Sequence, residues 1–200
     1  MTRILRYRVS SMMTVLVVLA VLPVAAAENV NGMTPAELFP GATFDPAIPT
    51  QAELLGFEPG SRPMRHPELL RYLTALADAS PRAELVTYSQ THEGRRMVYL
   101  AVSDEATIVR LDEFRAEHAQ RVDPRGRPAS DDAGLLGDAK AVAWIAYGIH
   151  GDELSSVDAA AAVAYRLVAG TDERARRMRR ELLVLIDPCE NPDGLSLIHI

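Results

Sequence analysis

One short stretch in the middle of the chain, a run of apolar residues that ends abruptly in polar ones, most constrains how the chain can fold. Residues 141–146 read AVAWIA, and YGIHGDE follows at residues 147–153. The apolar run is long enough for a buried strand and too short to span a membrane. The Ala-rich stretch 154–168 then has the length and composition of a helix. This pattern predicts His150 at the carboxyl end of a strand and Glu153 in the first turn of the next helix.

A second apolar run, residues 182–186, follows this helix and ends in DPCENPDG at residues 187–194. Two apolar strands joined by a helix predict a βαβ unit with parallel strands and a right-handed crossover. Parallel pairing would place His150 and Asn191 at the same edge of the sheet, where ligands bind in open α/β sheets. We expect Asn191 to order the loop beneath such a site rather than to contact a substrate.

The sequence before this unit predicts a hairpin flanked by helices. Two strand-like runs, residues 83–88 and 97–102, are separated by a turn in which Gly94 supplies the positive φ that a tight turn requires. The other predicted segments are a helix from His66 that stops at Ser80–Pro81, one helix over residues 106–120, a surface loop over residues 123–140, and a solvated helix or turn over residues 171–180.

Together these elements predict an α/β fold: a mixed, largely parallel sheet with helices on both faces. We expect the fold to be incomplete in this chain, because the sequence stops soon after the last strand and would leave a parallel pair exposed at the edge of the sheet. Trp144 and Tyr147 are expected in the core or in a pocket wall, where aromatic side chains usually lie.

The first residues resemble a secretory signal peptide. Three arginines among the first eight residues precede an apolar run at residues 12–22, and alanines at residues 25–27 offer a small-residue cleavage site. The alternative is an uncleaved N-terminal anchor, although the apolar run is short for a bilayer. We therefore expect residues 1–27 to be removed and the mature protein to be secreted or periplasmic, with no membrane attachment after cleavage.

The charge of the chain argues against polyanionic partners. The net charge is −6, and removal of the signal peptide takes away three arginines and no acid, which lowers it to −9. Such a protein has no electrostatic reason to bind nucleic acid or anionic lipid. The single cysteine, Cys189, cannot form an internal disulfide and is expected to be a small buried hydrophobic residue.

The residues His150 and Glu153 suggest a metal site. Zinc binds neutral imidazole nitrogen and carboxylate oxygen, and a catalytic zinc keeps three protein ligands and a water. Gly148 and Gly151 would let the backbone turn sharply at the end of the strand. The alternative interpretation is a surface histidine beside an acid that favours the N-terminus of a helix. The placement between a buried strand and a helix favours the metal site.

Three motifs resemble those of zinc carboxypeptidases of the carboxypeptidase A type. GIHGDE at residues 148–153 resembles their first zinc-ligand motif, NPDG at residues 191–194 resembles a later one, and EGR at residues 93–95 resembles a turn in the early hairpin. The motifs occur in the family's order and cover about residues 63–194. Residues 64–200 would then be the N-terminal part of a catalytic domain, preceded by an extended arm at residues 28–63 that is rich in Pro, Gly and Thr.

The resemblance implies one Zn²⁺ ion with His150 and Glu153 as two of its three protein ligands, as in the two-His, one-Glu site for which carboxypeptidase A is the familiar example. It places the third ligand, a His, further along than this sequence extends. The substrate-binding Arg and Asn–Arg pair and the general-base Glu would also come later, so no catalytic residue is expected in this chain. His199 lies too early to match the third ligand, and residues 195–200 depart from what usually follows the NPDG motif.

The implied function is that of a secreted zinc metallocarboxypeptidase, which removes C-terminal residues from peptides with a free C-terminus. The sequence does not distinguish food peptides from the stem peptides of peptidoglycan as its substrate. The fragment is expected to be inactive by itself. Two alternatives are a zinc N-acyl-amino-acid deacylase, which shares an H-G-x-E start on a similar sheet, and a non-catalytic relative that binds peptide or cell-wall material.

Overall fold

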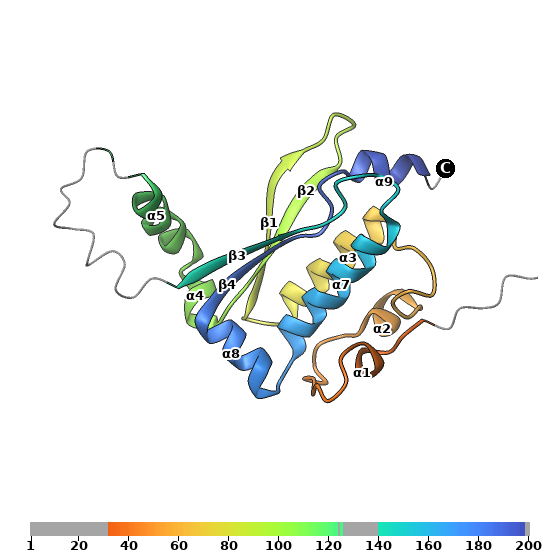
Figure 1. Ribbon diagram of the computed structural model, residues 1–200, viewed down its shortest axis with the longest axis horizontal. Coiled ribbons are helices and arrows are strands. Elements are labelled where there is room, and N and C mark those ends of the chain that lie inside the picture. The colour runs from red at the N-terminus through yellow and green to blue at the C-terminus, as the bar shows by residue number, and fades with distance from the viewer. Residues whose placement is uncertain (1–31, 124, 126–139, 199–200) are drawn as a thin grey trace, which may run out of the picture.

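The computed structural model describes residues 32–123, 125 and 140–198, which form a four-stranded sheet with helices on both faces (Figure 1). The strands are β1 (Ala83–Gln90), β2 (Arg96–Val102), β3 (Ala141–Ala146) and β4 (Leu182–Asp187). Their order in the sheet is β1-β2-β4-β3. The β1–β2 and β2–β4 pairs are antiparallel and the β3–β4 pair is parallel. The predicted mixed α/β class is therefore confirmed, with the parallel pairing of the described residues confined to β3 and β4.

The predicted βαβ unit is present. Helix α7 (Leu154–Ala169) follows β3, and helix α8 (Glu173–Glu181) leads into β4. The register runs from Ala141 opposite Leu182 to Ala146 opposite Asp187, so the two strands end level with each other. Most of the surface loop that we predict over residues 123–140 lies outside the described residues.

The hairpin of β1 and β2 forms where the sequence predicts it, and each strand extends further toward the turn. Gly94 has a φ of 79°, which is the left-handed conformation that the turn requires. A register shift between Thr87 and Ser89 adds a bulge to β1. The hairpin turn projects beyond the ends of β3 and β4 (Figure 1).

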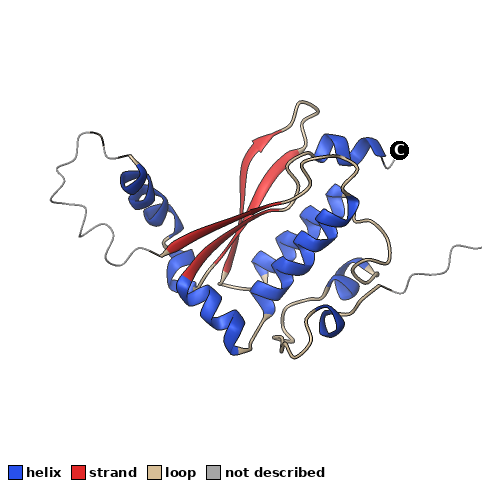
Figure 2. Cartoon of the chain, in the orientation of Figure 1, coloured by secondary structure: helices blue, strands red, loops and turns tan. Residues whose placement is uncertain are grey.

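One face of the sheet is covered by α3 (His66–Asp78) and α7, which lie side by side (Figure 2). Leu69, Leu73 and Leu76 recur at helical spacing and are fully buried, as the sequence predicts. Alanines on α7 are also fully buried, and their small side chains let this helix approach closely. The shared core includes Leu69, Leu73, Leu76, Leu100, Val102, Val157, Ala160, Ala161, Ala164, Val168, Val184 and Ile186.

The opposite face is covered in part by two helices, α4 (Glu105–Val109) and α5 (Leu111–Val122). The prediction of one helix over residues 106–120 is wrong, because the backbone leaves the helical conformation at Arg110 (φ −110°, ψ 26°). Ile108 and Leu111, on either side of this break, both bury their side chains in a second apolar cluster on the sheet.

The segment that precedes α3 contains two one-turn helices, α1 (Pro35–Leu38) and α2 (Gln51–Leu55). Each begins with a Thr-x-x-Glu capping box, in which the threonine and the glutamate satisfy each other's backbone N–H groups. The segment packs along α3 and α7, and Ile48 and Met64 from it are buried in the core. Composition alone gave no indication of these helices, although the two capping boxes are visible in the sequence.

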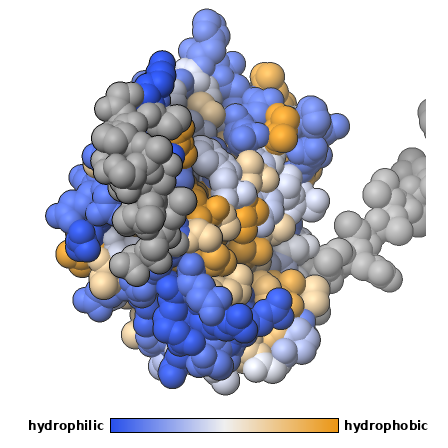
Figure 3. All heavy atoms as spheres, turned by 60° about the vertical axis from the view of Figure 1, so that its left-hand side comes forward, coloured by the Kyte–Doolittle hydropathy of each residue, from blue (hydrophilic) through white to orange (hydrophobic). Residues whose placement is uncertain are grey.

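Strand β3 lies at an edge of the sheet, and the prediction that Trp144 is a core or pocket residue is wrong. Trp144 is 60% exposed, because the outer edge of β3 has no partner strand within the described ranges. Apolar surface is visible in the centre of the face shown in Figure 3, bordered by hydrophilic residues. Tyr147 packs partly buried against the core, and Cys189 is buried, as predicted. None of the helices in the described part of the chain is long and apolar enough to cross a membrane.

Candidate metal site

The two loops that follow β3 and β4 run together beyond the end of the sheet. The Tyr147 N–H donates to the Asp187 carbonyl (3.0 Å), and the Tyr147 carbonyl accepts from the Glu190 N–H (2.9 Å). The Asn191 N–H then donates to the carbonyl of Gly148 (3.0 Å). The prediction that the ends of the two parallel strands meet at one edge is confirmed.

His150 and Glu153 lie against each other in the first of these loops. The His150 Nδ1 atom is 2.8 Å from Glu153 Oε1, and the His150 backbone N–H donates to Glu153 Oε2 (3.2 Å). Glu153 occupies the position just before α7 rather than its first turn, so its side chain folds back over the loop. The hydrogen bond to Glu153 raises the pKa of His150, and the same bond lowers the pKa of Glu153.

The donor chemistry of this pair fits a zinc ion. An imidazole nitrogen and a carboxylate oxygen lie 2.8 Å apart, and the side chains are 72% and 44% exposed, so an ion can reach them. Zinc binds such atoms at about 2.0–2.2 Å and would replace the hydrogen bond between them. Across residues 32–123, 125 and 140–198, no third His, Cys, Asp or Glu completes a metal-binding group. His199, the tail histidine considered above, lies outside these ranges.

The loop that holds the pair is supported by the NPDG turn. Gly151 packs directly on Gly194, and a Cβ atom on Gly151 would lie 2.5 Å from the Gly194 carbonyl oxygen. The side-chain oxygen of Asn191 accepts from the Gly194 N–H (2.9 Å), which supports our expectation that this asparagine orders the loop. Gly148, with a φ of 62°, makes the turn out of β3.

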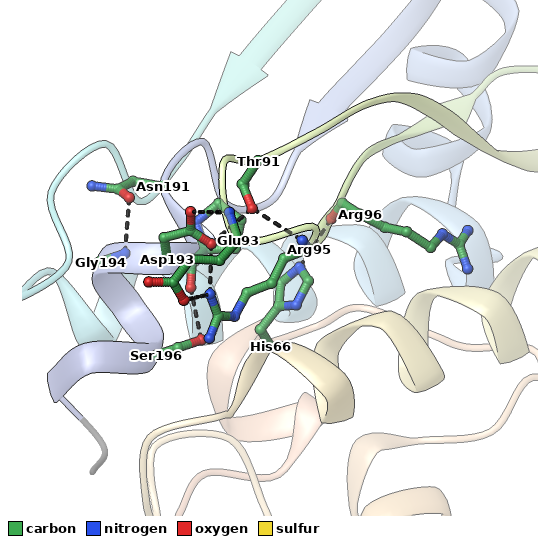
Figure 4. A network of polar contacts seen from close by, with 10 residues as sticks. His66, Thr91, Glu93, Arg95, Arg96, Asn191, Asp193, Gly194 and Ser196 are labelled. Atoms are coloured by element: carbon green, nitrogen blue, oxygen red, sulfur yellow. Dashed lines mark hydrogen bonds and ion pairs between the residues drawn. The ribbon is translucent and has the colours of Figure 1, made fainter.

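The EGR and NPDG motifs, about 100 residues apart, contact each other (Figure 4). The guanidinium of Arg95 lies 2.6 Å from Asp193 Oδ1 and also pairs with Glu93. Asp193 lies in the first turn of helix α9 (Pro192–Ile198). Sequence reasoning noted both motifs but had no signal that they touch, because the contact depends on the order of the strands in the sheet.

Sequence reasoning also missed Asp187, a buried carboxylate at the end of β4. Its side chain is 1% exposed; Oδ2 accepts from the Tyr88 hydroxyl (2.7 Å), and Oδ1 has no partner. Burial raises the pKa of Asp187, and burial together with this hydrogen bond raises that of Tyr88. A lone acid at the end of an otherwise apolar strand was the available signal.

The mixed α/β sheet, with His150 and Glu153 in the loop that follows a parallel strand, has the class of fold and the pair of side chains that the three sequence motifs predict. The model of the zinc carboxypeptidase family matches residues 69–200, and the chain belongs to this family. The resemblance seen in the three motifs is therefore confirmed.

The fold is also similar to that of a solved carboxypeptidase A. Carboxypeptidase A from Helicoverpa armigera is 18% identical, with a TM-score of 0.51, and the match covers 75% of this chain and 29% of that one. Thrombin activatable fibrinolysis inhibitor (TAFI) is 16% identical, with a TM-score of 0.46, over 68% of this chain and 27% of that one. The search among curated proteins gave no match.

Proposed function

We propose that this chain is the metal-binding N-terminal part of a secreted zinc metallocarboxypeptidase that removes C-terminal residues from peptides. The observation that supports this most directly is the contact between His150 Nδ1 and Glu153 Oε1, which lie 2.8 Å apart in the loop that follows the carboxyl end of β3. Membership of the zinc carboxypeptidase family supports the same chemistry. The chain spans 29% of the length of the carboxypeptidase A that it matches, so the activity of the whole enzyme belongs to the proposal.

Within this proposal, His150 and Glu153 hold one Zn²⁺ ion, which supplies Lewis-acid polarisation of the scissile carbonyl and a water of lowered pKa. The two ligands come from one loop, and the third ligand and the general base come from outside the described residues. Secretion rests on the signal-like residues 1–27, which also lie outside them. The substrate is a peptide with a free C-terminus, with peptidoglycan stem peptides included.

The ligand assignment is tested by the zinc content of the full-length gene product. We expect one zinc per wild-type chain, and a loss of at least tenfold in zinc affinity for His150→Ala and for Glu153→Gln, since each removes one of three protein ligands. Matched controls are His118→Ala on α5 and Glu84→Gln on β1, which lie away from the site. Retention of stoichiometric zinc by both ligand variants at unchanged affinity would contradict the assignment.

The reaction is tested with three substrate types. A metallocarboxypeptidase cleaves a peptide with a free C-terminus and spares its C-terminally amidated counterpart. Hydrolysis of N-acyl-amino acids but not of peptides would instead identify the deacylase alternative. Zinc binding with saturable peptide binding and no hydrolysis would identify the non-catalytic alternative.

A further inference from the structure

The carboxylate of Asp193, in the NPDG turn, is bound by the turn that joins β1 and β2, residues 91–95 (Figure 4). Its Oδ1 atom accepts from the Thr91 hydroxyl (2.7 Å) and from the Arg95 guanidinium (2.6 Å). Its Oδ2 atom accepts from the backbone N–H of Glu93 (3.2 Å). Both oxygens of one carboxylate are therefore bonded to donors from residues 91–95.

The hairpin turn is itself closed by internal hydrogen bonds. The Thr91 N–H donates to the Arg95 carbonyl (2.9 Å), and the Arg95 N–H donates to the Thr91 hydroxyl (3.0 Å). The Gly94 N–H donates to the Thr91 carbonyl (3.0 Å). Glu93 pairs with the same guanidinium that contacts Asp193. These internal bonds hold the turn in a conformation whose hydrogen-bond donors face the carboxylate of Asp193.

On its other side, the NPDG turn contacts the metal-site loop at positions that flank His150. Asn191 donates its N–H to the Gly148 carbonyl (3.0 Å), and Gly194 packs on Gly151 with no room for a Cβ atom. His150 thus lies between two contacts with a turn whose own position is set by the hairpin.

We propose that Asp193, held by the hairpin turn, is a positioning residue for the metal ligand His150. The hairpin fixes Asp193, Asp193 fixes the NPDG turn, and this turn fixes the backbone on both sides of the histidine. The inference rests on the proposed function, in that His150 must bind the metal. Substitution of residues that support metal ligands typically lowers the metal affinity by 10- to 100-fold. We expect a loss of about tenfold for Asp193, because it acts on His150 through the backbone.

The test measures the zinc dissociation constant of the full-length gene product by competition with a chromophoric chelator, alongside the Tm of the metal-free protein. Asp193→Ala should weaken zinc binding about tenfold, and Arg95→Ala should weaken it less, because Thr91 and Glu93 still donate to the carboxylate. The double variant should be no weaker than Asp193→Ala by more than about twofold, because Arg95 has no contact with this carboxylate left to lose. Arg95→Lys should restore most of the affinity. Thr91→Val, which removes only the hydroxyl, gives a milder variant with the same expected direction.

The matched control is Arg62→Ala, which removes a comparable surface ion pair with Glu68 (2.6 Å) on α3. We expect this variant to bind zinc as the wild type does. A lowered Tm with unchanged zinc affinity in the Asp193, Arg95 and Thr91 variants would overturn the positioning role while leaving the proposed function in place. If His150→Ala bound zinc as tightly as the wild type, the proposed function itself would be refuted.

Discussion

At the scale of single residues, the site depends on a position where no side chain can be accommodated. Gly151 lies against the backbone of Gly194, which cannot move aside as the end of a flexible side chain could. The sequence indicated that Gly151 would allow a sharp turn, but not that it would touch another loop. Turn propensity is local, whereas this contact arises from the parallel pairing of β3 with β4.

We expect Gly151→Ala to lower the free energy of unfolding by about 1–3 kcal/mol, because overpacking forces the two loops apart. Urea unfolding monitored by circular dichroism measures this change. Ser155→Ala, an exposed position at the start of α7, is the matched control and should stay within about 0.5 kcal/mol of the wild type. Equal urea midpoints of unfolding for the two variants would show that the two loops can separate without loss of stability.

A second residue-scale prediction concerns Asp158 on α7, which accepts from the Met64 N–H (3.1 Å). Burial raises its pKa to about 6. Because the folded state holds this proton more tightly than the unfolded state, stability falls as the pH rises from about 4 to about 6. Asp158→Asn keeps an acceptor oxygen and should be more stable than the wild type at pH 7 by on the order of 2 kcal/mol, with little difference near pH 4. Parallel pH profiles of Tm for the two proteins would refute this.

At the scale of elements, periodicity predicted α3, the hairpin and β4 closely, because each buries a regular apolar pattern. It failed at Arg110, where no Gly or Pro marks the break between α4 and α5. It also failed for Trp144, since an apolar run looks the same whether a strand lies in the centre of a sheet or at its edge. The charged segment at residues 171–180 forms α8, as one of the two predicted possibilities.

Helix α8 begins at an N-cap whose removal should be measurable. The Asp172 side chain accepts from the Ala175 N–H (3.2 Å) and pairs with Arg166 (2.9 Å), and this hydrogen bond with Arg166 lowers the pKa of Asp172 to about 2. The stabilisation that the ionised Asp172 provides is present above about pH 4 and is lost as the pH falls toward 2. Asp172→Ala should cost about 1–2 kcal/mol at pH 7, and Asp172→Asn, which keeps the cap, should cost less. Denaturant titrations at pH 7 and pH 2.5 test this, and an equal loss at both values would contradict the charge contribution.

At the scale of the whole molecule, the class of fold, the paired donors and the shared edge of β3 and β4 could all be predicted from the sequence. The placement of β2 between β1 and β4 could not be predicted. The contacts of Tyr88 with Asp187 and of Arg95 with Asp193 depend on this strand order, so they were not predicted either. These contacts join residues about 100 positions apart, and no local pattern encodes which strands become neighbours.

The exposed edge of β3 leads to a prediction for the 200-residue chain in isolation. Among residues 32–123, 125 and 140–198, no strand pairs with the outer edge of β3, and such an edge with an exposed aromatic side chain promotes association between copies. We expect the sedimentation coefficient of this chain to rise with protein concentration, and Trp144→Lys to reduce the rise, because a charge on the edge opposes pairing. Glu84→Lys on β1 is the control, and an identical concentration dependence in both variants would rule out β3 as the contact.

The support of His150 by the NPDG turn has a consequence for biosynthesis. The two proposed ligands are only three residues apart, yet the backbone on either side of the histidine is fixed by residues 191–194, which leave the ribosome some forty residues later. We therefore expect chains truncated before this turn to hold the loop of His150 and Glu153 loosely, so that this pair of side chains is in place only once residues 191–194 have been synthesised.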